Sequence, residues 1–203
     1  MGEIIVMGEA QEALEFWEKV EMDKNYFNTP QPQMYIIEEA IRQLELPSPA
    51  RICEFGCGMG RNLAYLREKR TEDYLYGIDC NERSINIAKQ NYTNIHFEVG
   101  SLKELKGFCE VIFTVSMLDH VPNPIDYLNK FMLSANNILL LELQLPTFGR
   151  IDDPNIIDFS YSHDYENIFK DPDLIVPISN YTSKPVQLAP DGFLSHYKLY
   201  TIK

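Results

Sequence analysis

The stretch that decides the fold is Arg51-Ile52-Cys53-Glu54-Phe55-Gly56-Cys57-Gly58-Met59-Gly60. Its first half is apolar enough for a buried strand, and after the glycines a helical pattern places Leu63 and Leu66 on one face. A glycine turn between a strand and a helix brings backbone amides and a helix N-terminus close to a bound ligand. The segment therefore predicts an open α/β sheet with a ligand site at residues 54–60.

Downstream of this stretch, short apolar runs alternate with helical patterns. The expected strands are Arg51–Phe55, Tyr74–Ile78, Ile95–Val99, Glu110–Val115, Ile138–Leu143, Leu174–Ser179 and Tyr197–Ile202. Helices are expected after Gly60, around Ile85, after Pro124 and over His163–Phe169. Because strands alternate with helices, we expect a mostly parallel sheet with helices on both faces.

The first 50 residues form a helical lead-in to this series. Leu14, Trp17 and Val20 recur at helical spacing, and a second helical pattern begins at Pro32 and ends before Pro47. Several aromatic side chains of the lead-in either close a pocket for the substrate or only cover the sheet. They are Trp17, Tyr26, Phe27 and Tyr35.

The composition restricts the class of protein. At 203 residues we expect one domain over 1–203. The net charge of -12 and a pI of about 4.7 disfavour nucleic acid as a partner, because phosphate binding needs a basic surface. Residues 1–12 carry no secretory pattern, and no window approaches the roughly 18 apolar residues of a membrane span. We expect a cytoplasmic protein with no membrane partner.

The glycine-rich stretch resembles motif I of the class I S-adenosylmethionine (SAM)-dependent methyltransferases, E/D-x-G-x-G-x-G. The four matching positions are Glu54, Gly56, Gly58 and Gly60. The resemblance spans residues 50–145 and implies a Rossmann-like three-layer α/β/α sandwich. Its mostly parallel seven-stranded sheet would have an antiparallel last strand, with 1–50 as lead-in or lid and 51–203 as the core. The G-x-G-x-x-G pattern of nicotinamide enzymes fails, since Arg61 and Leu63 occupy its third glycine position.

The same resemblance implies SAM as cofactor, S-adenosylhomocysteine as product, and further cofactor-binding residues. These are Cys57, Asp79, Cys80, Ser101, Leu102 and Met117. Asp79 ends the second expected strand, where an acid accepts hydrogen bonds from ribose hydroxyls, although it would also suit the cap of the next helix. Ser101 stands where the family has an acid near adenine, or it caps a short turn.

Three residues are the candidates for catalysis: Asp119, His120 and His163. By the resemblance, Asp119 and His120 border the transferred methyl group, and His120 has the pKa range of a general base. The alternative is that His120 only orders its loop. His163 lies in a polar and aromatic segment in which Ser162 would cap the following helix. No metal is expected, because residues 144–147 lack the Asp-Asn pair of metal-dependent relatives, although Asp152 and Asp153 follow.

Missing motifs narrow the choice of acceptor. Residues 116–119 lack the pattern of amine-directed nucleic-acid methyltransferases, and the paired-glutamate loop of protein arginine enzymes is absent. We therefore expect a small-molecule acceptor with an oxygen, nitrogen or carbon nucleophile. A protein methyltransferase and a SAM-binding regulatory protein without turnover stay open as alternatives, and so does a homodimer.

Overall fold

A seven-stranded sheet lies at the centre of the computed structural model, which describes residues 2–21, 32–152, 158–186 and 197–203. Its strand order is β3-β2-β1-β4-β5-β9-β8. The bounds are β1 (Arg51–Phe55), β2 (Tyr74–Asp79), β3 (His96–Val99), β4 (Cys109–Val115), β5 (Ala135–Leu143), β8 (Tyr181–Val186) and β9 (Tyr197–Ile202). Strands β1 to β5 pair in parallel, whereas β9 is antiparallel to β5 and β8. The predicted sheet with its antiparallel last strand is confirmed.

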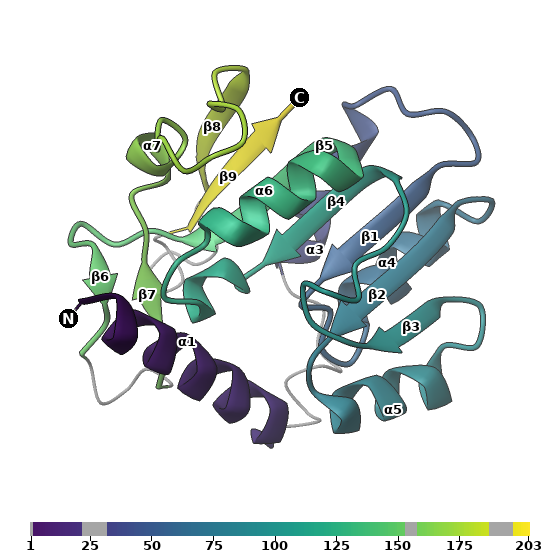
Figure 1. Cartoon of the computed structure of the whole chain (residues 1–203). Helices are drawn as coiled ribbons and strands as arrows, with labels where there is room; N and C mark the ends of the chain where they lie inside the picture. Colours follow the sequence, from purple (N-terminus) through teal and green to yellow (C-terminus); the bar gives the residue numbers. More distant parts are fainter. Residues whose placement is uncertain (1, 22–31, 153–157, 187–196) are drawn as a thin grey trace.

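Helices cover both faces of this sheet (Figure 1). One face packs against α3 (Pro32–Arg42), α4 (Arg61–Lys69) and α5 (Glu82–Asn91), and the other against α6 (Ile125–Ser134) and α7 (Tyr165–Ile168). Side chains alternate between the two faces, as a strand requires: Ile52 joins the first core cluster and Cys53 the second. The predicted three-layer α/β/α sandwich is confirmed.

Helix α1 (Gly2–Lys19) lies outside these layers, across the edge of the sheet where the parallel strands end (Figure 1). Asn81, which follows β2, donates from Nδ2 to the backbone oxygens of Trp17 and Val20 at 2.9 and 3.0 Å. Near the middle of α1, Glu9 accepts a hydrogen bond of 2.9 Å from the hydroxyl of Tyr161. None of the described helices is both long and apolar enough to cross a membrane.

Tyr161 belongs to a small hairpin formed by β6 (Gly149–Arg150) and β7 (Tyr161–Ser162), which the sequence patterns did not indicate. Its strands have only two residues each, too short to give an alternating pattern. The backbone continues the pairing, because the amide of Ile151 donates to the oxygen of Ser160 at 2.8 Å. The hairpin gives α1 a support at the carboxyl edge of the sheet.

The strand predicted at Leu174–Ser179 is wrong. This segment forms turns, in which the amide of Leu174 donates to Asp171 at 3.2 Å and that of Ile178 to Phe169 at 2.9 Å. Both side chains are buried, so their apolar pattern reflects core packing rather than a ladder, and Pro177 lacks the amide that a ladder needs. The sixth strand is β8, whose exposed edge residues Lys184 and Pro185 discourage further pairing.

Candidate functional site

The glycine turn after β1 has a backbone that other residues rarely adopt. Gly56 and Gly58 have φ of +77° and +52°, in the left-handed region. The amides of Gly56 and Cys57 donate to the oxygen of Ile78 at 2.8 and 3.0 Å, which ties the turn to the end of β2. A Cβ on Gly56 would lie 2.2 Å from Cγ of Met117. The turn therefore needs glycine for its conformation and for the close approach of the loop that carries Met117.

Asp79 joins this turn to the end of β2. Its Oδ2 accepts from the amide of Gly58 at 2.7 Å and its Oδ1 from that of Asn81 at 2.8 Å. Burial raises the pKa of Asp79, and the two amides oppose that rise. The cap of α5 is Asn81, whose Oδ1 accepts from the amide of Ser84 at 2.9 Å, rather than Asp79. Each carboxylate oxygen of Asp79 keeps a second acceptor position for a ligand.

Glu54 is a buried carboxyl at the end of β1, with 1% of its surface exposed. Its Oε1 accepts a hydrogen bond of 2.6 Å from Nδ2 of Asn62 on α4. Its Oε2 is buried and has no hydrogen-bond partner among the described residues. Burial raises the pKa of Glu54 to about 8. An unpaired buried carboxyl oxygen beside the glycine turn is what a ligand with a polar hydrogen would satisfy.

The two cysteines of the predicted site face different surroundings. The Cys57 thiol is buried in the core, 2.8 Å from where a Cβ on Gly77 would lie, so only the backbone of this residue remains for a ligand. Cys80 is half-buried directly after Asp79, and burial raises its pKa to about 12. Both thiols therefore stay protonated at neutral pH.

The segment after β3 reaches the same edge of the sheet. The amide of Gly100 donates to the backbone oxygen of Asp79 at 2.9 Å, which brings Ser101 next to the end of β2. The amide and hydroxyl of Ser101 both donate to Glu104 Oε2, at 2.7 and 2.8 Å, so Ser101 takes part in closing the turn. Leu102 is half-buried against the core. The serine oxygen keeps lone pairs for a ligand amine.

Asp119 and His120 follow β4 on a short 3-10 helix, Leu118–His120. Asp119 is 3% exposed, and among the described residues its Oδ1 has no hydrogen-bond partner. This oxygen lies 3.6 Å from Nε2 of His120, too far for a hydrogen bond. Burial raises the pKa of Asp119 to about 7 and lowers the pKa of His120 to about 4. His120 is therefore neutral at physiological pH.

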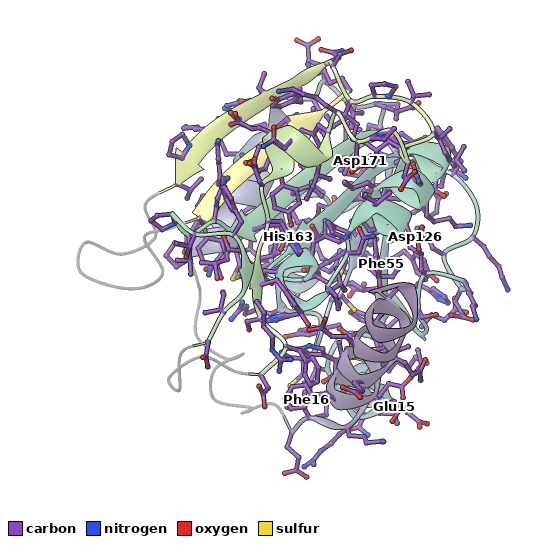
Figure 2. All side chains as sticks on the ribbon, turned by 60° about the vertical axis from the view of Figure 1, so that its left-hand side comes forward. Glu15, Phe16, Phe55, Asp126, His163 and Asp171 are labelled. Atoms are coloured by element: carbon purple, nitrogen blue, oxygen red, sulfur yellow. The ribbon has the colours of Figure 1, made fainter. Side chains whose placement is uncertain are left out.

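His163 is buried, with 7% of its surface exposed, and its side chain is labelled in Figure 2. Its Nε2 is 3.0 Å from the oxygen of Leu118 and 2.9 Å from that of Val121, so this nitrogen carries a proton and donates to them. Burial lowers the pKa of His163. Ser162, the expected cap of α7, lies in β7 instead, and Asp164 caps the helix by accepting from the amide of Asn167.

The structure adds contacts that the sequence did not indicate. The rings of Trp17 and His120 are in contact with centroids 4.0 Å apart and planes tilted by 38°, and Nδ1 of His120 is 3.4 Å from the backbone oxygen of Phe159 and from the hydroxyl of Ser160. Glu142, a charged residue in the apolar run of β5, lies directly behind the loop after β4. That charge within an apolar strand was the available signal for Glu142, whereas nothing local indicated Phe159.

Of the two predicted lead-in aromatics that the structure describes, Trp17 and Tyr35, Trp17 lies next to the predicted site residue His120. Tyr35 is 53% exposed and contacts the ring of Tyr65 on α4, with centroids 5.1 Å apart, so it packs on the outer side of that helix. Tyr26 and Phe27 lie outside the described residues. The structure thus places Trp17 against His120 and Tyr35 against α4.

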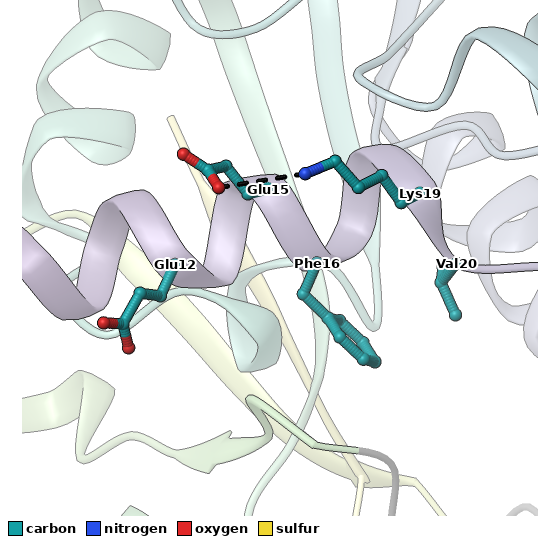
Figure 3. A pocket seen from close by; sticks show the side chains of 5 residues that line it. All are labelled: Glu12, Glu15, Phe16, Lys19 and Val20. Carbon is teal, nitrogen blue, oxygen red and sulfur yellow. Dashed lines mark ion pairs between the residues drawn. The ribbon is translucent and has the colours of Figure 1, made fainter.

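A hollow of about 430 Å³ lies along α1 and is lined by Glu12, Glu15, Phe16, Lys19 and Val20 (Figure 3). Glu15 and Lys19 form an ion pair of 3.8 Å, with Phe16 and Val20 on the opposite side of the helix (Figure 3). The hollow contains none of the predicted site residues, so it does not define the site. Within the described part of the chain, no three His, Cys, Asp or Glu residues cluster as metal ligands do, and Asp153 lies outside that part.

Comparison with known proteins gives a family match. A family model described as a methyltransferase domain matches residues 31–166, more than half of the chain. A curated relative, trans-aconitate 2-methyltransferase from Deinococcus radiodurans, is 27% identical over 75 residues, which is 36% of this chain. The matched segment spans 29% of that relative's length.

Solved structures share the fold along nearly the whole chain. The plantazolicin methyltransferase BpumL in complex with SAH is similar with a TM-score of 0.69 and 19% identity, covering 100% of this chain and 98% of that one. The magnesium protoporphyrin IX methyltransferase ChlM from Synechocystis PCC 6803, with bound SAM, has a TM-score of 0.63 and 15% identity, covering 99% and 96%. At these identities the likeness concerns the fold alone.

Proposed function

This chain belongs to the methyltransferase domain family, with the class I Rossmann-like fold, and we propose that it transfers the methyl group of SAM to a small-molecule acceptor. The proposal treats residues 1–203 as one domain, with residues 1–50 as its lead-in. SAM supplies the methyl group on a sulfonium that is its own leaving group, so the protein has to bind and align two reactants and accept a proton where the acceptor carries one.

The observation that carries the proposal is the arrangement of the cofactor side, which we define as residues 54–60 and 79–81. Here the carboxyl ends of β1 and β2 meet, because the two strands are parallel neighbours. The Gly58 amide already holds Asp79 in place, and Glu54 offers a buried oxygen without a partner among the described residues. Acceptors held in advance lose little freedom when a ribose or an ammonium group binds, so these residues suit SAM.

The acceptor side comprises Trp17, residues 118–121 and residues 159–163. The proposal gives the proton step to the pair Asp119 and His120, because the imidazole of His120 is neutral and can accept a proton, while the neighbouring carboxyl has a pKa of about 7, close to neutral pH. His163 is proposed to hold the loop, because its Nε2 donates to two backbone oxygens. The indole N–H of Trp17 is buried without a partner in the described part of the chain and would donate to the acceptor.

A small molecule is the acceptor we propose, for two reasons. The net charge of -12 opposes binding of a polyanion. The curated relative, which is named for trans-aconitate, supports the same choice. The acceptor nucleophile is an oxygen, nitrogen or carbon atom.

The test is calorimetry of the purified protein with SAM, S-adenosylhomocysteine and NAD. Wild type should bind both sulfur nucleotides and not NAD. Asp79→Ala should bind S-adenosylhomocysteine at least 100-fold more weakly, because hydrogen bonds to a charged group contribute roughly 1.5–3 kcal/mol each.

The matched control is Asp126→Ala, which removes an exposed carboxylate at the start of α6 and should bind like wild type. Binding of NAD in preference to SAM, or equal binding by the Asp79 and Asp126 variants, would refute the cofactor assignment. If the nucleotides bind, release of S-adenosylhomocysteine in a screen of small organic acids, phenols and amines tests turnover, and its absence for all of them would favour a regulatory SAM-binding protein.

A further inference from the structure

Glu142 is a fully buried acid near the carboxyl end of the apolar strand β5. Its Oε1 accepts a hydrogen bond of 2.5 Å from the hydroxyl of Thr114 on β4. Its Oε2 accepts two backbone hydrogen bonds, from Met117 at 3.0 Å and from Asp119 at 3.2 Å. One side chain thus fixes the backbone of Met117, in the loop next to the cofactor side, and the backbone of Asp119, which belongs to the proposed proton-accepting pair.

The loop that Glu142 holds leaves β4 in an unusual conformation. Ser116 has φ of +49° although it is not glycine, so the chain turns sharply there. The Ser116 amide donates to the oxygen of Leu141 at 3.0 Å, and its hydroxyl is hydrogen-bonded to that of Tyr197. After this turn, the amides of Met117 and Asp119 point back toward β5. Without an acceptor there, two buried amides would lack partners.

The charges around Glu142 do not favour a buried carboxyl at this position. No salt bridge to Glu142 forms among the described residues, and the groups nearest to it include the acid Asp119 and the hydroxyl of Tyr165. Burial, and then the Asp119 carboxyl, raises the pKa of Glu142 to about 8. An apolar residue would avoid the penalty of burying an acid here. What an apolar residue lacks is the acceptor for the loop amides.

We propose that Glu142 is a positioning residue: by accepting the amides of Met117 and Asp119, it sets the loop that packs on the glycine turn and carries Asp119 and His120. The inference rests on the proposed function, because it assigns Glu142 a role in that same site. Glu142 acts through the loop and touches neither reactant.

Three variants separate the acceptor role of Glu142 from its charge. Glu142→Met keeps the length of the side chain and removes both acceptors, so S-adenosylhomocysteine should bind about tenfold more weakly or worse. Glu142→Gln should recover binding to within about threefold of wild type, because its amide oxygen serves the two loop amides while its NH2 group donates to the Thr114 hydroxyl. Thr114→Val is the matched control, since it removes a contact of Glu142 but leaves the loop amides bonded.

A second readout is the exchange of backbone amide hydrogens followed by NMR in the absence of any nucleotide. The amides of Met117 and Asp119 should exchange at least tenfold faster in Glu142→Met than in wild type and Glu142→Gln, while the amides of β1 keep their protection. If Glu142→Met does not fold, the wild-type protein still tests the inference. As the pH is varied, the chemical shift of the Met117 amide proton should change together with that of the side-chain carboxyl carbon of Glu142.

Equal nucleotide binding by Glu142→Met and wild type, equal amide exchange, or a Met117 shift independent of Glu142 would each overturn the inference. If wild type binds neither SAM nor S-adenosylhomocysteine, the proposed function fails. The NMR measurements use no nucleotide, so they still report whether Glu142 holds the loop, and the two failures can be told apart.

Discussion

The cofactor side is built from residues close together in the chain, whereas the acceptor side joins distant segments. On the cofactor side, Gly58 and Asp79 are 21 residues apart and belong to consecutive strand–turn units. On the acceptor side, His120 contacts Phe159, 39 residues away, and also the ring of Trp17 in the lead-in. The lead-in is itself fixed by the bond between Glu9 and Tyr161, 152 residues apart.

This difference affects how each side tolerates substitution. The cofactor side depends on backbone conformations and on a bond between main chain and carboxylate, so it is sensitive to the identity of single residues. The acceptor side depends on side chains from α1, the 3-10 helix and the segment at 159–163, which can change together while the sheet stays the same. We therefore expect substitutions on the two sides to separate cofactor binding from turnover.

The largest expected effect separates the two sides most sharply. His120→Asn should lower kcat by roughly 10²- to 10⁴-fold for a hydroxyl or carbon acceptor, because a proton acceptor is lost. Binding of S-adenosylhomocysteine should stay within about threefold of wild type. The measurement pairs the rate of S-adenosylhomocysteine release with calorimetry, and His96→Asn, exposed on β3, is the control. Full turnover in His120→Asn would give the proton step to another group and leave His120 with a role in ordering the loop.

A substitution in the glycine turn should have a smaller effect, and a second glycine with the same backbone conformation provides the control. Gly60 and Gly107 both have φ of +81°, but a Cβ on Gly60 would lie 2.5 Å from the buried ring of Phe97, whereas nothing lies within 4 Å of one on Gly107. Gly107→Ala should lower the free energy of unfolding by about 1–2 kcal/mol through backbone strain alone. Gly60→Ala should lower it by about 2–4 kcal/mol, measured by urea unfolding. Equal losses would show that the core around Phe97 yields to the added methyl.

The smallest expected effect is a change of stability with pH, which arises from buried carboxyls on both sides of the site. Burial raises the pKa of Glu54 to about 8, that of Asp119 to about 7 and that of Glu142 to about 8. Between pH 6.5 and 8 the folded protein retains protons that the unfolded chain has lost, so stability falls as pH rises. The lowered pKa of His120 acts in the opposite sense only below about pH 6.5, where the unfolded chain protonates.

The free energy of unfolding should therefore fall by on the order of 2 kcal/mol between pH 6.5 and 8. Urea titrations at both values measure it. Glu54→Gln, on the cofactor side, should remove part of the fall, and Asp119→Asn should remove more, because Asp119 also raises the pKa of Glu142. Stability that is level or rises over this window would contradict the direction of all three shifts.

Much of the fold could be predicted from the sequence, because apolar runs and helical spacing are local properties. The strand–glycine–helix unit at 51–69 and the three-layer sandwich agree with those patterns. The strand predicted at Leu174–Ser179 is absent from the structure, because buried side chains in a turn give the same apolar pattern as a strand. The position of β8 in the sheet depends on its pairing with β9, and no local sequence pattern predicts that pairing.

The sequence by itself determined the family, the sheet and the place of the glycine turn and Asp79, since each depends on residue types at short spacing. Only the tertiary structure decided that the ring of Trp17 packs against that of His120, that His163 supports a loop, and that Glu142 accepts two loop amides. The physical reason is that those contacts join segments whose distance along the chain carries no information about their distance in space. A buried polar group shows its role only when its partners are known.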